Sequence, residues 1–193
     1  MPRLSRALLI AAAAASFFAA APGARAEDVS IDPNHTSAHF AAKHLLISTV
    51  QGDIPVKSVK VTLAPNNIPT SVEATLDLTK IDTHNDQRDS DLRSDKFLNV
   101  QQFPEMAFKS TKITPQSGGN FVMNGDLTIR GVTKPVSVSG NVVGTVKDGK
   151  GKTHVGYAAS LTLDRTQFGI GANVPPEVVG TNINVTIEAE AIL

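Results

Sequence analysis

The sequence contains no cysteine and no tryptophan, and it has a single tyrosine. The lack of cysteine excludes disulfide bonds, a thiol nucleophile and thiolate metal ligands, so the packed core alone must stabilise the fold. Long apolar runs are also missing beyond the N-terminal segment, and a membrane helix needs about 20 apolar residues. These absences predict a water-soluble mature protein that folds around an aliphatic core.

The first 26 residues have the three parts of a cleavable secretory signal. Arg3 and Arg6 precede an apolar run of 15 residues, from 7 to 21, and Ala24-Arg25-Ala26 is a small-residue cleavage site. An uncleaved N-terminal anchor is the alternative. We expect cleavage after Ala26, which leaves one mature domain, residues 27–193, outside the cytoplasm.

Charge gives no sign of a polyanionic partner. Cleavage would remove three of the 18 basic residues and none of the 18 acidic ones, which leaves a net charge of −3 with histidines neutral. The lysines are scattered singly, whereas nucleic-acid binding normally needs a basic patch. We therefore expect no nucleic-acid partner.

Alternation of apolar and polar residues dominates the mature chain, and this period of two is typical of strands with one buried face. Residues 155–163 and 183–189 show it most clearly. Turn-forming clusters separate the alternating segments into hairpins. The pattern predicts eight strands, near residues 37–43, 50–63, 71–80, 106–114, 120–130, 134–147, 152–165 and 181–193.

One charged stretch interrupts this rhythm and predicts a short helix near residues 86–98, capped at Asn85 or Asp86. Eight antiparallel strands can form a sandwich or a closed barrel, and closure removes exposed edges, so we favour the barrel. Such a barrel either is filled by side chains or holds one small ligand. With few aromatic residues in the mature chain, a ligand cavity and a packed aliphatic core both stay open.

Catalytic and metal-binding motifs are absent from the sequence: it has no G-x-S-x-G, no phosphate-binding glycine loop and no H-E-x-x-H. His84 and Arg88 lie among carboxylates and could act in acid–base chemistry, although helix capping explains the same cluster. His35 and His39 are four residues apart in a strand-like segment, which separates them by about 13 Å. We therefore expect no metal site, no cofactor and no enzymatic activity.

Asp164 and Arg165, which stand at the end of an expected strand, have the pattern of a charged pair beside a bend. We interpret them as structural residues. Gly125, Gly131 and Gly169 mark expected tight turns or close backbone approaches.

Several blocks together resemble the YceI-like family of periplasmic polyisoprenoid-binding proteins. The most specific is Leu127-Thr128-Ile129-Arg130-Gly131-Val132-Thr133-Lys134-Pro135-Val136, preceded by Gly125. The other blocks occur in order at residues 31–45, 81–97, 103–111 and 164–170. Two positions depart from the family pattern, because Val29 replaces a common tryptophan and Ile54 replaces an aromatic residue.

The resemblance implies a lipocalin-like barrel that holds an isoprenoid or other long-chain lipid, such as a quinone or polyprenyl phosphate, in the periplasm. Transient membrane contact would then be expected. We assign the apolar lining to Phe40, Leu76, Leu78, Phe97, Phe108, Leu127, Ile129, Leu161, Leu163 and Phe168. Polar contacts at the mouth are assigned to His44, Arg88 and Arg93.

Two other functions stay open at this point. A filled barrel would serve as an interaction or stress protein of the cell envelope. An enzyme would use the cluster around His84 and Arg88 on a small molecule.

Overall fold

The computed structural model describes residues 27–193, so the expected signal peptide, residues 1–26, lies outside the described residues. This part of the chain forms ten strands and one α-helix, α1, at Asp86–Arg93. The strands are β1 Glu27–Ile31, β2 Ser37–His44, β3 Ser48–Asp53, β4 Val56–Leu63, β5 Pro69–Asp77, β6 Glu105–Pro115, β7 Asn120–Ile129, β8 Val132–Lys147, β9 Thr153–Asp164 and β10 Val179–Ile192. Four short 3₁₀ turns are η1 Pro33–His35, η2 Leu78–Lys80, η3 Ser117–Gly119 and η4 Arg165–Phe168.

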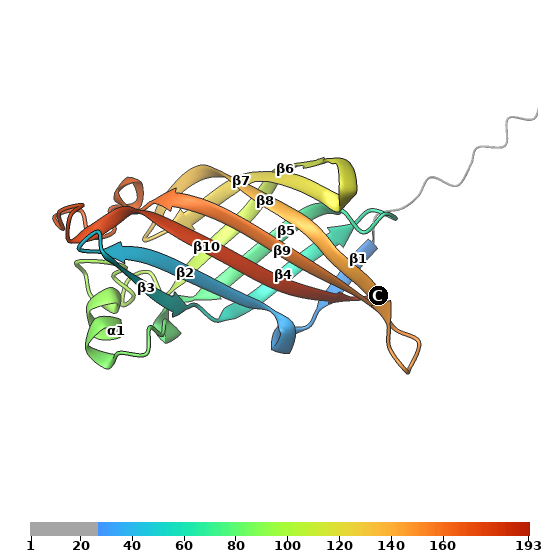
Figure 1. The fold of residues 1–193 in the computed structure, drawn as a ribbon, viewed down its shortest axis with the longest axis horizontal. Coiled ribbons are helices and arrows are strands. Elements are labelled where there is room, and N and C mark those ends of the chain that lie inside the picture. Colours follow the sequence, from blue (N-terminus) through green and yellow to red (C-terminus); the bar gives the residue numbers. More distant parts are fainter. Residues whose placement is uncertain (1–26) are drawn as a thin grey trace, which may run out of the picture.

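Eight of the strands close into a ring (Figure 1). The order is β1-β4-β5-β6-β7-β8-β9-β10, and β10 pairs again with β1, with every neighbouring pair antiparallel. The hairpin of β2 and β3 extends the sheet from β10. The predicted eight-stranded antiparallel barrel is therefore confirmed.

The expected single strand at 50–63 is wrong, because the structure divides it into β3 and β4 at Ile54 and Pro55. Proline has no N–H for a strand ladder. The Ile54 N–H still donates to the Ala38 carbonyl at 3.0 Å, whereas the Pro55 carbonyl accepts from Asp77 N–H at 2.9 Å. The chain thus changes partner at this point, from β2 to β5. Strand β1, only five residues long, was not predicted.

The predicted helix exists but ends at Arg93 instead of residue 98. Asn85 is its N-cap, and the Asn85 side-chain oxygen accepts from Arg88 N–H at 2.9 Å. The Ser94 hydroxyl donates to the Asp91 carbonyl at 2.6 Å and ends the helix. Figure 1 shows α1 at one end of the barrel, opposite the C-terminus. Among the described residues, no helix has both the length and the apolar character needed to cross a membrane.

Two apolar clusters make up the core. One lies toward α1 and includes Leu78, Leu98 and Phe168, and the other includes Val61, Phe121 and Val155. Phe108, Val136 and Leu161 pack against both clusters. The α1 end of the barrel is therefore closed by packed side chains, which the alternating strand pattern alone could not indicate.

Arg165 organises the loop between η4 and β10. The residue is 1% exposed, and its guanidinium donates to five backbone carbonyl oxygens, those of Ile170, Gly171, Val174, Val179 and Gly180, at 2.6–3.1 Å. These bonds use all five N–H donors of the side chain. Burial lowers the pKa of this guanidinium. The structural role predicted for Arg165 is confirmed, whereas Asp164, predicted as its charged partner, instead caps η4 by accepting bonds from the Thr166 N–H and hydroxyl.

Candidate ligand-binding cavity

The barrel interior contains a cavity of about 170 Å³. Its walls include Ile54, Leu127 and Leu163 from the cluster near α1, and Phe121 and Met123 from the other cluster. The cavity thus passes between the two clusters. Its surface is almost entirely carbon, so it offers a site for an apolar molecule.

The cavity follows from strand alternation combined with small side chains. Inward positions on β5, β9 and β10 carry Ala74, Ala159 and Ala189, and all three line the cavity. They are only half-buried, although they point into the barrel. Protein interiors normally leave few voids larger than a water molecule. The structure therefore does not have the completely filled barrel that the sequence left open.

Three cavity phenylalanines each lie over a glycine on the neighbouring strand. The pairs are Phe40 over Gly52, Phe108 over Gly125 and Phe121 over Gly140. A Cβ atom built at each glycine would lie 2.4 to 2.7 Å from a ring carbon. Because glycine has no side chain, each phenylalanine ring can pack closely against the barrel wall. The interior space beside the ring therefore stays open. The close approach predicted at Gly125 is confirmed.

Two residues with polar side chains, His39 and Tyr157, are among those that border the cavity. Tyr157 is 9% exposed and its hydroxyl donates to the Asn67 carbonyl at 2.8 Å, while burial raises its pKa to about 12. His39 is 48% exposed and its imidazole bonds the Asp53 carboxylate. The His39 side chain is therefore on the outer face of β2, between the cavity-lining residues Ala38 and Phe40.

Six of the ten residues predicted as apolar lining do border the cavity: Phe40, Leu76, Phe108, Leu127, Leu161 and Leu163. The other four lie toward the α1 end. Leu78, Ile129 and Phe168 belong to the packed cluster there, and the Phe97 ring lies against Gly171. Whether any of the ten touches a ligand stays a prediction.

The three residues predicted at a polar mouth do not line the cavity. The Arg88 guanidinium donates to the Thr83 hydroxyl at 2.8 Å and to the Thr83 carbonyl at 2.7 Å. Arg93 donates to the Ile81 carbonyl at 3.3 Å. His44 is exposed at the end of β2. Both arginine side chains thus donate hydrogen bonds to the segment that precedes α1.

The charged cluster around His84 forms a capping network. His84 has a left-handed backbone with φ of 59°, and its N–H donates to Asp82 Oδ1 at 2.7 Å. Its imidazole is 80% exposed, 3.6 Å from the same carboxylate. Buried Asp89 accepts bonds from both the N–H and the hydroxyl of Thr83. The cluster therefore holds the start of α1 and does not border the cavity.

Sequence reasoning missed the smaller lining residues. Val56, Val59, Val138, Ala159 and Ala189 all border the cavity. For all but Val56 the signal was present, because each lies on the apolar face of an alternating strand; Val56 is out of phase with Val59, since the register of β4 shifts between Val56 and Ser58. The predicted lining consisted of large apolar residues, mainly phenylalanine and leucine, whereas the cavity remains open where the side chains are small.

A closed antiparallel barrel around a narrow apolar cavity defines the lipocalin-like class of β-barrel. The YceI-like domain model matches residues 30–191. The chain therefore belongs to the YceI-like family.

Known proteins agree with this assignment. A UPF0312 protein of Vibrio parahaemolyticus is 33% identical over 151 residues, which cover 77% of this chain and 80% of that protein. The crystal structure of the Campylobacter jejuni YceI protein superposes with a TM-score of 0.73 at 27% identity, over 78% of this chain and 89% of that chain. A polyisoprenoid-binding domain from Saccharophagus degradans has the same fold, with a TM-score of 0.61 at 12% identity over 86% of this chain and 98% of that chain.

Proposed function

We propose that this protein is a binding and carrier protein that holds a long-chain isoprenoid, such as a quinone or polyprenyl phosphate, inside its barrel. The observation that carries the proposal is the cavity, because it has an almost wholly apolar wall and extends between the two core clusters. The polyisoprenoid-binding domain named for the Saccharophagus degradans structure supports the same ligand class.

The energetics of the cavity favour an apolar chain. Each buried methylene contributes about 0.8 kcal/mol, so ten carbons would contribute roughly 8 kcal/mol before ordering costs. The cavity of about 170 Å³ is smaller than the roughly 300 Å³ at which typical ligand pockets begin. A long chain therefore requires side chains to move, and Met106 and Met123 in the wall are the flexible ones.

Binding accounts for this interior better than catalysis does. Among the described residues 27–193, none that borders the cavity carries a carboxylate, and His39 and Tyr157, which do border it, already have hydrogen-bond partners. The acid–base candidates His84 and Arg88 lie outside it. We therefore propose that the chain is not an enzyme.

A carrier must contact the membrane that supplies its lipid, and we propose the tip of the β2–β3 hairpin for this contact. Leu45, Leu46 and Ile47 are 51%, 63% and 85% exposed. Leu45 and Leu46 also have left-handed backbones, with φ of 50° and 60°. Exposed apolar residues grouped in this way are typical of interaction sites. His44 directly precedes this tip and is exposed, and we propose that it contacts lipid head groups.

The N-terminal segment fits a periplasmic carrier. We propose that residues 1–26 direct export and that the mature protein begins at Glu27. Cell fractionation followed by N-terminal sequencing tests this proposal. A periplasmic protein whose first residue is Glu27 is the expected result, and an intact N-terminus in the cytoplasm would overturn it.

Native mass spectrometry of the exported protein, followed by solvent extraction, tests the ligand. We expect a stoichiometric mass that extraction identifies as a prenyl or other long-chain lipid. Protein that carries no lipid, and takes none from vesicles containing a prenylquinone or a polyprenyl phosphate, would refute the carrier proposal.

A further inference from the structure

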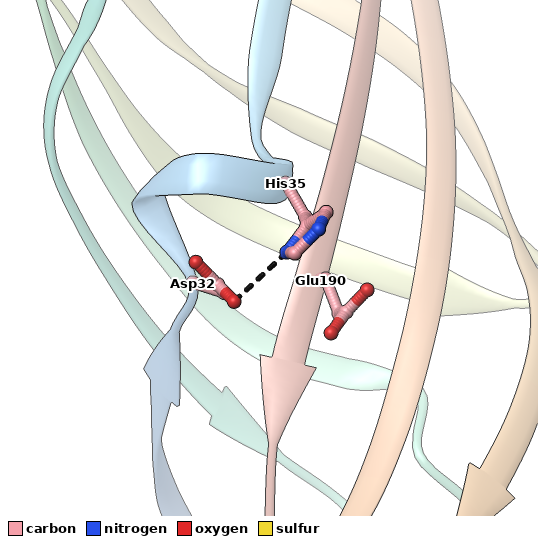
Figure 2. Close-up of side chains that lie close together, drawn as sticks. All are labelled: Asp32, His35 and Glu190. Atoms are coloured by element: carbon pink, nitrogen blue, oxygen red, sulfur yellow. Dashed lines mark hydrogen bonds and ion pairs between the residues drawn. The ribbon is translucent and has the colours of Figure 1, made fainter. Parts of the chain in front are cut away.

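The strongest cluster of metal-ligating side chains lies on the outer wall of the barrel, away from the cavity. Asp32, His35 and Glu190 each offer one ligand atom there, and all three atoms lie within 4.8 Å of one another. Figure 2 shows Asp32 and His35, from the segment around η1, facing Glu190 on β10.

The protein already fixes Asp32. As the N-cap of η1, its Oδ1 accepts from Asn34 N–H at 2.8 Å, and its own N–H donates to the Glu190 carbonyl at 2.8 Å. Its other oxygen, Oδ2, lies 2.9 Å from His35 Nδ1. Oδ1 of Asp32 is therefore engaged in capping η1, whereas Oδ2 lies beside His35.

Glu190 has a second layer of partners. Its Oε1 lies 2.6 Å from Nδ1 of His154 on β9, and Nε2 of His154 lies 3.2 Å from Asp148 Oδ2. Hydrogen-bonded partners of this kind orient metal ligands and increase their affinity. The chain from Asp148 through His154 therefore positions the Glu190 carboxylate.

Open space adjoins the three side chains. An outer hollow of about 470 Å³ is lined by His35 and Glu190, among others, and also by Gly156. Gly156 is paired with Glu190 across β9 and β10 and has no side chain to cover it. Water or a small anion therefore has room to complete a coordination sphere that begins with three protein ligands.

We propose that Asp32, His35 and Glu190 bind a divalent transition-metal ion of the Zn²⁺ class. One imidazole and two carboxylates suit such an ion, whereas Ca²⁺ and Mg²⁺ take oxygen ligands almost exclusively. Sequence reasoning could not pair His35 with Glu190 near the other end of the described chain, because only closure of the barrel brings the two residues together.

The position of the site gives the ion a structural role. Strands β1 and β10 close the ring through only two residue pairs, Ser30 with Ile192 and Ile31 with Ala191. The metal would join the segment directly after β1 to Glu190 on β10. It therefore strengthens the seam at which the barrel closes, independently of any lipid in the cavity.

Isothermal titration of tag-free, EDTA-treated protein with Zn²⁺ tests the proposal, together with thermal unfolding and the visible spectrum of the Co²⁺ form. We expect one site, a higher melting temperature with Zn²⁺, and binding at least about tenfold weaker in Asp32→Asn, His35→Gln and Glu190→Gln. Asparagine caps helices as well as aspartate does, so Asp32→Asn should keep the fold.

Glu188→Gln is the matched control, because Glu188 lies two residues away on the same strand and lines the same hollow without belonging to the cluster. It should bind Zn²⁺ as the wild type does. No binding by a folded wild-type protein, or equal affinity in Glu190→Gln and Glu188→Gln, would overturn the proposal and leave the cluster as a hydrogen-bonded clasp.

Discussion

Replacing Ala159 by leucine should block the ligand without damaging the barrel. Ala159 lines the cavity on β9, between Gly140 of β8 and Ile187 of β10. Leucine adds three carbon atoms at this position, which exclude three carbons of a bound chain. At about 0.8 kcal/mol for each buried methylene, the loss is about 2.4 kcal/mol. Binding should therefore weaken roughly 50-fold, since about 1.4 kcal/mol corresponds to a factor of ten.

The assay is fluorescence titration with a dansyl-labelled farnesyl chain. Ala107→Leu is the matched control, because Ala107 lies on β6 with its side chain exposed. It should leave Kd unchanged. Urea unfolding should show that Ala159→Leu is at least as stable as the control, since its new carbons enter existing space. Unchanged affinity in Ala159→Leu, or equal loss in both variants, would refute the placement of the chain in this cavity.

Three further predictions concern residues that pack or hydrogen-bond within the barrel. Gly140→Ala places a Cβ atom 2.4 Å from the Phe121 ring. In urea unfolding it should lower the free energy of unfolding by about 1–3 kcal/mol. The control Gly144→Ala should lower it little, because no atom lies within 4 Å of the added Cβ. Equal effects of the two would contradict the ring-over-glycine packing. Arg165→Met leaves five carbonyl oxygens without their donor and should cost roughly 3 kcal/mol or more by the same measurement, against almost nothing for exposed Lys112→Met. Tyr157 is the single tyrosine, so ultraviolet titration should show its pKa near 12; because the unfolded residue titrates first, near 10.0, stability should fall as pH rises from 10 to 12. An ordinary pKa in the folded protein would disprove its burial.

Much of the fold could be predicted because strand alternation is a local signal. Residues 155–163 and 183–189 alternate, and they form β9 and β10. The division at Pro55 was missed because a strand that changes partner keeps its alternation on both sides. Strand β1 was missed because its five residues are too few for a clear period.

The candidate site was less accessible to sequence reasoning. Phe40 and Phe108 could be chosen as large apolar residues, but Leu78 and Phe168 are also large and apolar and fill the closed end from the turns η2 and η4. The difference depends on their position along the barrel axis, which no local pattern encodes. Asp32 and Glu190 meet only because the ring closes.

Closure of the ring between β1 and β10 also has a consequence for the order of folding. The first strand of the described chain cannot complete its pairing until the last strand is present, because Ile31 pairs with Ala191. Contacts between residues so distant in sequence make folding slow, since the entropy of a long loop must be lost before they form. During synthesis from the N-terminus, β1 and β10 therefore stay apart until β10 has been made, and the cavity can exist only after that step.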